Sequence, residues 1–277
     1  MQRLIKLLNK VNNISLKREK YNISMVGYLN TQPFKWALED LIQQGHELIL
    51  ENPADCARSL MTDRVDLALI PVGSLKDMND YHLHTDYCIG CDGEVRTVVL
   101  LSNDPLEQVH TIYLDDHSRT SQLLTRVVVS GFKGIECEYV EKNISEMAIL
   151  QSGEAALMIG DKVFDYEDKF EYSYDLGMAW KEFTGLPFVF AVWVSKKADI
   201  PSSQFIDQIN EKMEKVFSNL DYYLQERPAF YNGVLQDRYF RKNISYGFDK
   251  SKKMALQLFL QKVEELQSSK DYLFSSR

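Results

Sequence analysis

The sequence contains no run that approaches the roughly 18 apolar residues of a membrane-spanning helix, and this excludes a transmembrane protein of the ordinary helical kind. It has only four cysteines, at positions 56, 88, 91 and 137, which are too scattered for a disulfide framework, and we expect reduced thiols. Basic residues are fewer than acidic ones: 32 Lys and Arg against 40 Asp and Glu give a net charge of −8. An acidic chain without a basic stripe argues against nucleic acid as a partner.

Several catalytic signatures are also missing. There is no Gly-x-Ser-x-Gly elbow, which argues against a serine hydrolase of the α/β type. There is no Gly-x-Gly-x-x-Gly motif and no P-loop, which argues against dinucleotide or nucleoside triphosphate use. The first residues lack the apolar core of a secretory signal, so we expect a cytoplasmic protein.

The chain of 277 residues is 45% apolar, enough for a sizeable core. At about 150 residues per domain it forms one large domain or two. Residues 1–20 carry six Lys or Arg against one Glu, a local charge of +5. This segment is a membrane-surface helix or transit peptide, or else a frayed extension; we favour the extension, because so short a helix rarely anchors a protein alone.

From residue 22 onward the pattern alternates between strand and helix. Strands are expected over 23–29, 46–50 and 65–72, with helices over 34–44 and 53–61 between them. This order predicts parallel βαβ units. Two longer strands, 81–89 and 95–101, flank Asp92-Gly93, a pair typical of a turn.

A second alternating series follows. Strands are expected over 111–114, 135–140 and 155–159, and helices over 118–129 and 145–151. A β-prone return strand over 188–194 precedes long amphipathic helices over 202–226 and 249–267. The order predicts an α/β protein with two lobes joined by two crossovers. We expect an N-terminal extension at 1–21, one lobe from 22–105 plus 195–277, and the other from 106–194, with a ligand cleft between the lobes.

Two segments that pass from strand to helix are candidate ligand loops. In the first, Asn30 and Thr31 offer neutral polar groups at a helix N-terminus, which suits a carboxylate, although Asn30 as a simple N-cap is an equal reading. The second places Ser118, Thr120 and Ser121 around Arg119. Three hydroxyls exceed what an N-cap needs, so we favour carboxylate binding there.

Several other residues have both a structural and a functional interpretation. Asp161 after Gly160 is a cleft residue or an N-cap, and Phe188 is an apolar cleft wall or part of the core. The spacing of Cys88 and Cys91 occurs in redox and zinc sites, but there is no second pair, and it leads into a strand rather than a helix. We expect no metal site here.

Taken together, these loops resemble the chorismate dehydratase family, the first enzymes of the futalosine route to menaquinone. The resemblance spans about residues 22–265. Its segments, in order, are 26–34, 70–72, 95–102, 114–121, 159–161, 175–177 and 184–193. Thr97 stands where the family is expected to have Ser; threonine keeps the hydroxyl and adds a methyl group.

The resemblance implies the fold of type II periplasmic binding proteins and dehydration of chorismate to 3-[(1-carboxyvinyl)oxy]benzoate, without a cofactor. It implies that Asn30 and Thr97 act near the reacting ring, and that Ser118, Arg119, Thr120 and Ser121 hold one carboxylate. The remaining residues expected to bind substrate are Tyr28, Thr31, Gly160, Asp161 and Phe188.

No Glu or His base stands out in these loops, so we hypothesise that the enolpyruvyl carboxylate of the substrate takes the ring proton while Asn30 orients it. Two alternatives stay open. One is the sister enzyme on the same fold, 1,4-dihydroxy-6-naphthoate synthase. The other is a non-catalytic binding protein for small carboxylates.

Overall fold

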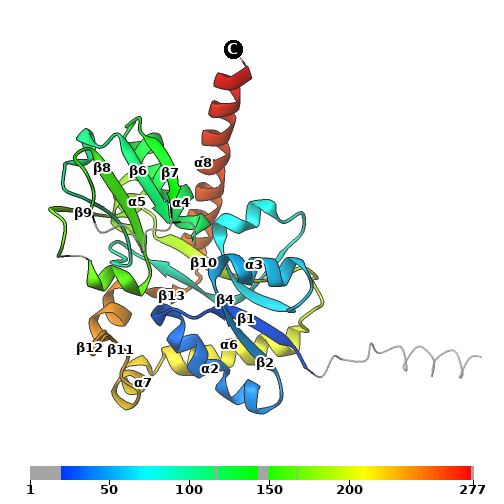
Figure 1. Ribbon diagram of the computed structural model, residues 1–277. Coiled ribbons are helices and arrows are strands. Elements are labelled where there is room, and N and C mark those ends of the chain that lie inside the picture. Colours follow the sequence, from blue (N-terminus) through cyan, green and yellow to red (C-terminus); the bar gives the residue numbers. More distant parts are fainter. Residues whose placement is uncertain (1–19, 116–117, 143–148, 167, 276–277) are drawn as a thin grey trace, which may run out of the picture.

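The computed structural model describes residues 20–115, 118–142, 149–166 and 168–275. Within these residues the strands form two large sheets and one short hairpin, and the two sheets lie one above the other as the cores of two lobes (Figure 1). The N-terminal extension and the expected helix over 145–151 fall wholly or mostly outside the described residues.

The first sheet has the strand order β13-β4-β10-β3-β1-β2. Strands β1 (Asn22–Val26), β2 (Glu47–Glu51) and β3 (Leu67–Pro71) are parallel, linked through helices α2 (Gln32–Gln43) and α3 (Pro53–Met61). Strand β10 (Phe188–Ser195) lies antiparallel between β3 and β4 (His82–Cys91), and β13 (Ser245–Gly247) covers the edge. The βαβ units expected from the sequence are confirmed.

The second sheet has the order β7-β6-β8-β5-β9. Strands β6 (Thr111–Asp115), β7 (Glu138–Lys142) and β8 (Glu154–Ile159) are parallel, whereas β5 (Val98–Ser102) is antiparallel to both β8 and β9 (Tyr172–Asp175). Helix α4 (Arg119–Arg126) continues into the π-helical turn η4 (Val127–Phe132), and α5 (Leu176–Thr184) leads back to the first sheet.

The C-terminal part ties the lobes together. Helices α6 (Ser203–Phe217) and α7 (Leu220–Glu226) are followed by the hairpin β11 (Phe230–Tyr231) and β12 (Val234–Leu235), and then by the π-helical turn η7 (Tyr239–Asn243). Helix α8 (Lys250–Ser275) contacts β10 of the first sheet and η4 of the second lobe, and in Figure 1 it runs alongside the upper lobe. Short 3-10 helices complete the chain: η1 (Leu29–Thr31), η2 (Val72–Asp77), η3 (Leu106–Gln108) and η6 (Asp161–Asp165).

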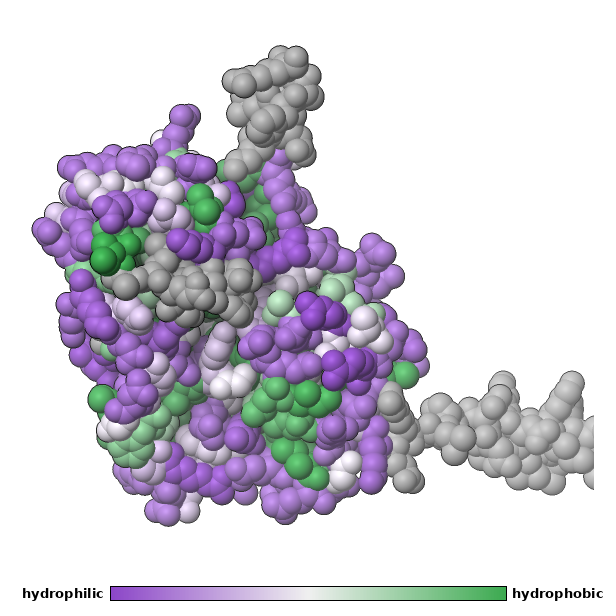
Figure 2. All heavy atoms as spheres, in the orientation of Figure 1, coloured by the Kyte–Doolittle hydropathy of each residue, from purple (hydrophilic) through white to green (hydrophobic). Residues whose placement is uncertain are grey.

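An aromatic cluster stands where the lobes meet. Trp180 on α5, Phe188 on β10 and Phe259 on α8 have ring centroids 5.1–6.0 Å apart, in edge-to-face arrangements. The Trp180 indole also donates a hydrogen bond to the Pro187 carbonyl at 3.0 Å. Edge-to-face pairs add to the stabilisation from burial, so this cluster fixes α5, β10 and α8 together. The outer surface drawn in Figure 2 is mostly hydrophilic.

The structure corrects two expected lobe boundaries. The boundary at 105 placed residues 98–102 in the first lobe, and the boundary at 194 placed the return strand in the second. The structure instead places β5 in the second lobe, where it pairs with β8 and β9. It places β10 in the first lobe, where it pairs with β3 and β4. Since β4 and β5 lie in different sheets, Asp92-Gly93 belongs to a crossover and not to a hairpin. Both strands are almost wholly buried, and such apolar runs do not specify their partners.

A buried ammonium group fastens α8 to the edge of the first sheet. Lys252 is 2% exposed, and its Nζ donates hydrogen bonds to the Ser245 carbonyl at 2.8 Å, the Ser245 hydroxyl at 2.6 Å and the Gly247 carbonyl at 2.6 Å. Three acceptors satisfy the three N–H donors of an ammonium, so this lysine holds β13 in place from behind.

We therefore expect Lys252→Met to lower the free energy of unfolding by about 2–3 kcal/mol, because it leaves buried acceptors without a donor. Urea unfolding measures this loss. The matched control is Lys253→Met, since Lys253 is exposed and its ammonium only overlies the Phe248 ring at 5.4 Å. Equal effects of the two substitutions would contradict the role given to Lys252.

Candidate functional site

A small chamber of about 70 Å³ lies between the lobes. Val26, Pro71 and Ile159, which end β1, β3 and β8, place it at the carboxyl ends of parallel strands in both sheets. None of the described residues that line it carries a charged side chain. They are Val26, Tyr28, Asn30, Pro53, Pro71, Ile89, Val95, Thr97, Val98, Ser118, Thr120, Ser121, Ile159, Gly160, Phe190, Ala191 and Ile244.

Asn30 presents an unsatisfied acceptor at this chamber. Its backbone carbonyl accepts a hydrogen bond from the Tyr246 hydroxyl at 2.9 Å, which fixes η1 from behind. Its side-chain oxygen Oδ1 is buried and has no hydrogen-bond partner among the described residues. Buried polar atoms are nearly always paired in folded proteins. An unpaired amide oxygen on a chamber wall therefore points to a bound molecule as its partner.

Thr97 stands on the crossover between the sheets. It is 2% exposed, and its Oγ1 lies 2.9 Å from the hydroxyl of Tyr239 in η7. The segment before it is held by the half-buried Asp175, whose carboxylate accepts the N–H groups of Val95 at 3.0 Å and Arg96 at 2.6 Å. Burial raises the pKa of the Asp175 carboxyl, and these N–H groups oppose that rise. Thr97 is thus held on both sides by fixed groups.

The start of α4 brings three hydroxyls to the chamber. Ser118 is the N-cap: its Oγ accepts the N–H of Ser121 at 3.3 Å and donates to the Ser121 hydroxyl at 2.9 Å. Thr120 joins the lobes, because its Oγ1 accepts the N–H of Gly73 at 3.0 Å and donates to the Phe190 carbonyl at 3.3 Å. Ser121 Oγ accepts from Ser118 and keeps its own proton for a ligand.

Arg119 faces away from the chamber. It lines a separate outer cavity of about 490 Å³ and forms an ion pair with Asp77 of the first lobe at 2.5 Å. Arg58, Lys76 and Arg126 line the same outer cavity, together with the acidic Asp77 and Glu141. The outer cavity is larger, but its described lining includes no buried polar side-chain atom without a partner, so the chamber with its unpaired amide oxygen is the better candidate.

The other residues expected from the sequence are placed as follows. Tyr28 and Gly160 line the chamber on opposite lobes, and the left-handed backbone of Gly160, with φ of 72°, favours glycine. Thr31 is buried and its hydroxyl bonds to the Val26 and Tyr28 carbonyls. Phe188 belongs to the aromatic cluster, and its neighbour Phe190 is the phenylalanine that lines the chamber.

Asp161 joins the two lobes beside the chamber without lining it. Its carboxylate oxygens lie 3.0 and 3.3 Å from the N–H of Leu29 in the other lobe. Burial raises the pKa of Asp161, and the Leu29 N–H opposes this rise. The structure therefore gives this carboxylate the role of an acceptor that holds η1.

Sequence reasoning missed a buried ion pair next to the chamber. Lys162 on η6 lies 2.5 Å from the carboxylate of Asp115, which is fully buried at the end of β6. The pKa of Tyr28 is raised to about 12 by burial, by the charge of Asp115 and by that of Asp161. Asp116 and His117 of the same loop lie outside the described residues. Tyr239 and Tyr246 were also missed, because no local motif marks them.

Cys88 and Cys91 are buried on β4, and burial raises the pKa of both thiols well above its usual range. Buried thiols of this kind are unreactive.

No group of three or more His, Cys, Asp and Glu side chains in the described ranges is arranged to hold a metal ion. The described helices include none that is both long and apolar enough to cross a membrane.

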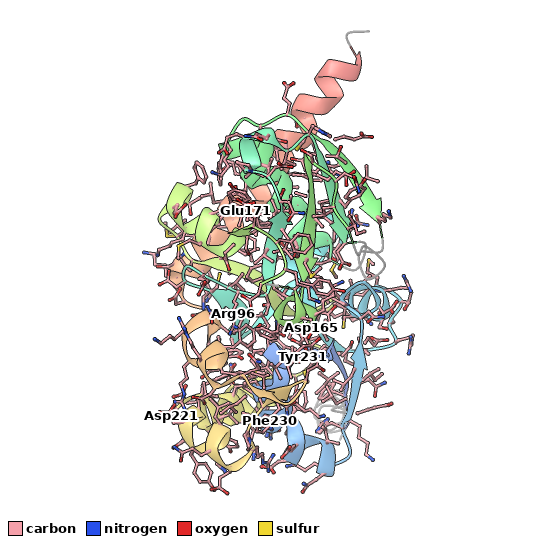
Figure 3. The ribbon with its side chains drawn as sticks, turned by 60° about the vertical axis from the view of Figure 1, so that its left-hand side comes forward. Arg96, Asp165, Glu171, Asp221, Phe230 and Tyr231 are labelled. Atoms are coloured by element: carbon pink, nitrogen blue, oxygen red, sulfur yellow. The ribbon has the colours of Figure 1, made fainter. Side chains whose placement is uncertain are left out.

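Several bridges draw the lobes together around the chamber. Besides the Thr120, Asp77 and Asp161 contacts, Asp165 on η6 accepts hydrogen bonds from the Tyr231 hydroxyl at 2.7 Å and the Asn232 amide at 2.9 Å. Figure 3 shows Asp165 and Tyr231 next to each other where the lobes meet. Ligand pockets typically measure about 300–1,000 Å³, so the chamber must widen to hold a ligand of that size.

Comparisons with known proteins agree with this architecture. A family model described as menaquinone biosynthesis matches residues 21–265. A chorismate dehydratase of Thermus thermophilus is 24% identical over 210 residues, which is 69% of this chain and 75% of that protein.

Solved structures give the fold. A protein of Archaeoglobus fulgidus aligns with a TM-score of 0.65 at 15% identity, covering 90% of this chain and 98% of that one. The periplasmic aliphatic sulphonate binding protein of Escherichia coli aligns with a TM-score of 0.58 at 13% identity, covering 91% and 88%. The two-lobed, periplasmic-binding-protein-like fold expected from the sequence is confirmed.

The raised pKa of Asp161 gives a stability prediction with a definite sign. The pKa of Asp161 in the folded protein lies above the ordinary value of 3.8. Its contribution to the free energy of unfolding is therefore fully present below pH 3.8 and is lost as the pH rises through the folded pKa. Asparagine keeps an acceptor for Leu29 and does not ionise. We therefore expect Asp161→Asn to gain stability relative to the wild type as the pH rises from about 4 to 7, measured by urea unfolding.

The control for this prediction is Asp165→Asn. Hydrogen bonds from Tyr231 and Asn232 lower the pKa of Asp165, so its contribution is present above the ordinary pKa and lost as the pH falls. Asp165→Asn should therefore lose stability relative to the wild type as the pH rises toward about 4, and its difference should stay nearly constant from about 4 to 7. A difference for Asp161→Asn that is also constant over this range, or that falls over it, would contradict the prediction.

Proposed function

We propose that this chain, which belongs to the menaquinone biosynthesis family, is a chorismate dehydratase that works in the cytoplasm. The reaction converts chorismate to 3-[(1-carboxyvinyl)oxy]benzoate and water. The family resemblance of the loops and the name of the Thermus thermophilus relative support this assignment. The observation that carries it is the unpaired Asn30 oxygen in a chamber that Thr97 also lines and whose described lining holds no charged side chain.

A carboxylate of the substrate would bind at the start of α4. The Ser121 hydroxyl keeps a proton to donate, and the first N–H groups of a helix have no partner within the helix. The positive end of the helix dipole also favours an anion there. Arg119, expected to join this group, lies in the outer cavity and takes no part in it.

The chemistry requires little beyond positioning and the passage of one proton. The ring loses one hydroxyl group and one proton, and the remaining bonds become aromatic, so the driving force lies in the substrate. The base takes the proton from the ring and passes it on to the departing hydroxyl group, which leaves as water. We assign to the hydroxyl of Thr97, a residue that lines the chamber, the hydrogen bond to the departing oxygen.

The base is the substrate's own enolpyruvyl carboxylate. The described chamber wall holds no carboxylate or imidazole, and the nearby Asp161 and Asp115 are engaged by the Leu29 N–H and the Lys162 ammonium. The amide of Asn30 orients the reacting part of the substrate without ionising. The proton thus passes from one atom of the substrate to another within a neutral enclosure.

The direct test is to incubate the purified protein with chorismate, without added metal or nucleotide, and to separate the products by chromatography with mass detection. We expect a product lighter by one water, formed at a rate proportional to enzyme. Thermal stabilisation by chorismate without turnover would favour the non-catalytic binding protein. Neither stabilisation nor turnover would make the sister naphthoate synthase the next assay.

Single substitutions test the assigned roles. We expect Asn30→Ala and Thr97→Val each to lower kcat on the order of 10²–10³-fold, as loss of an oriented polar group near a reacting centre does. Asp161→Asn should lose far less. A loss beyond about 10³-fold for Asp161→Asn, with substrate binding and fold intact, would identify Asp161 as the base and refute the substrate carboxylate in that role. Asp165→Asn, also on η6, is the matched control.

A further inference from the structure

We propose that Tyr239 is a positioning residue that turns the hydroxyl proton of Thr97 into the chamber. This inference rests on the proposed function and adds a residue to it. Tyr239 does not line the chamber and belongs to η7, more than 140 positions after Thr97 in the chain. It acts on the substrate only through the hydroxyl in front of it.

The phenol of Tyr239 is enclosed and has few polar neighbours. The residue is 0% exposed, and its ring packs edge-on against Phe164 and Phe240, with centroids 5.5 and 5.6 Å away. Its hydroxyl contacts Thr97 Oγ1 at 2.9 Å and interacts with the Asn30 side chain. The Tyr239 hydroxyl therefore interacts with both Thr97 and Asn30, the two residues assigned to act near the reacting ring.

Burial determines the protonation state of this phenol. Removal from water raises the pKa of Tyr239 far above its ordinary value of 10, and the contacts with Thr97 and Asn30 reverse only part of that rise. The phenol remains neutral across the whole physiological range. It then has one proton to donate and lone pairs with which to accept.

The position of Asn30 decides where that proton goes. Because Asn30 Oδ1 has no partner among the described residues, it does not accept the phenol proton. Among the described residues, Thr97 Oγ1 is the acceptor that lies within hydrogen-bond distance of the phenol, at 2.9 Å. The phenol proton is left for Thr97 Oγ1.

A chain of hydrogen bonds follows from these assignments. The phenol of Tyr239 donates to Thr97 Oγ1, and Thr97 donates in turn to a ligand in the chamber. Thr97 has then received a hydrogen bond on the side facing Tyr239, and its own proton points to the chamber that it lines. Successive hydrogen bonds of this kind polarise and strengthen one another. Thr97 is thereby set as a donor before substrate arrives.

Removing the phenol oxygen breaks the chain without removing packing. In Tyr239→Phe the ring remains between Phe164 and Phe240, so the fold is expected to be kept, and thermal unfolding checks this. Thr97 loses its fixed donor, and its hydroxyl is free to rotate away from the substrate. We expect kcat to fall about 10-fold, within the range of a single oriented hydrogen bond, with KM changed less than about 2-fold.

The test is a double-mutant cycle with chorismate as substrate, in which kcat and KM are measured for the wild type, Tyr239→Phe, Thr97→Val and the double variant. If Tyr239 acts through Thr97, the phenylalanine substitution lowers kcat in the wild type and has no further effect on Thr97→Val. In a Thr97→Ser background the hydroxyl is present, and the sensitivity to Tyr239→Phe returns. A merely structural tyrosine would not show this pattern.

The matched control is Tyr139→Phe, which removes a half-buried phenol that bonds to Ser130 at 2.7 Å in the second lobe and should leave kcat unchanged. Losses that multiply in the double variant would overturn the inference while leaving the dehydratase assignment intact, as would an unchanged kcat in Tyr239→Phe. A wild type that does not convert chorismate would instead overturn the proposed function, and the inference with it.

Discussion

The arrangement of the two lobes depends on the carboxylate of Asp175, which connects the two crossover segments between them. It accepts hydrogen bonds from Val95 and Arg96 on the outgoing crossover and from Met178 at the start of α5, on the way back. A side chain at Gly177 would come within 2.6 Å of the Cys91 sulfur, so this close approach requires glycine. The Asp175 carboxylate thus caps α5 and joins both crossovers. It also fixes the position of Thr97, two residues beyond Val95, at the chamber.

The chamber is neutral although the protein is acidic, and the structure achieves this by engaging each nearby charge elsewhere. Lys162 neutralises Asp115, the N–H of Leu29 occupies Asp161, and backbone N–H groups occupy Asp175. Hydroxyls, an amide and helix N–H groups remain to face a ligand. A bound carboxylate would then supply the main charge in the chamber, where hydrogen bonds to it are stronger than in water.

Local pattern was enough to predict much of the first sheet and the start of α4. Strand β3, helix α3 and the Ser118 cap follow from apolar runs, a proline in the first turn and a hydroxyl before a helix. The sheet assignment of β5 and β10 was not predictable, because strands buried on both faces carry no mark of their partners. Helix α5 and strand β9 were missed, and residues 202–226 form two helices with a break at Ser218. For the site, Asn30 was proposed from its position at the start of a helix and Thr97 from the resemblance, whereas Tyr239 is brought to Thr97 only by the folded chain.

The basic lining of the outer cavity has a consequence for how fast an anion reaches the protein. The chain as a whole carries a charge of −8 and repels a dianion at long range, whereas Arg58, Lys76, Arg119 and Arg126 outnumber Asp77 and Glu141 around this opening. The Debye length shrinks from about 30 Å at 0.01 M salt to about 8 Å at physiological ionic strength. Moderate salt therefore removes the distant repulsion while the nearby cations still attract, so diffusional capture of a doubly charged ligand is faster in cell-like salt than in dilute buffer.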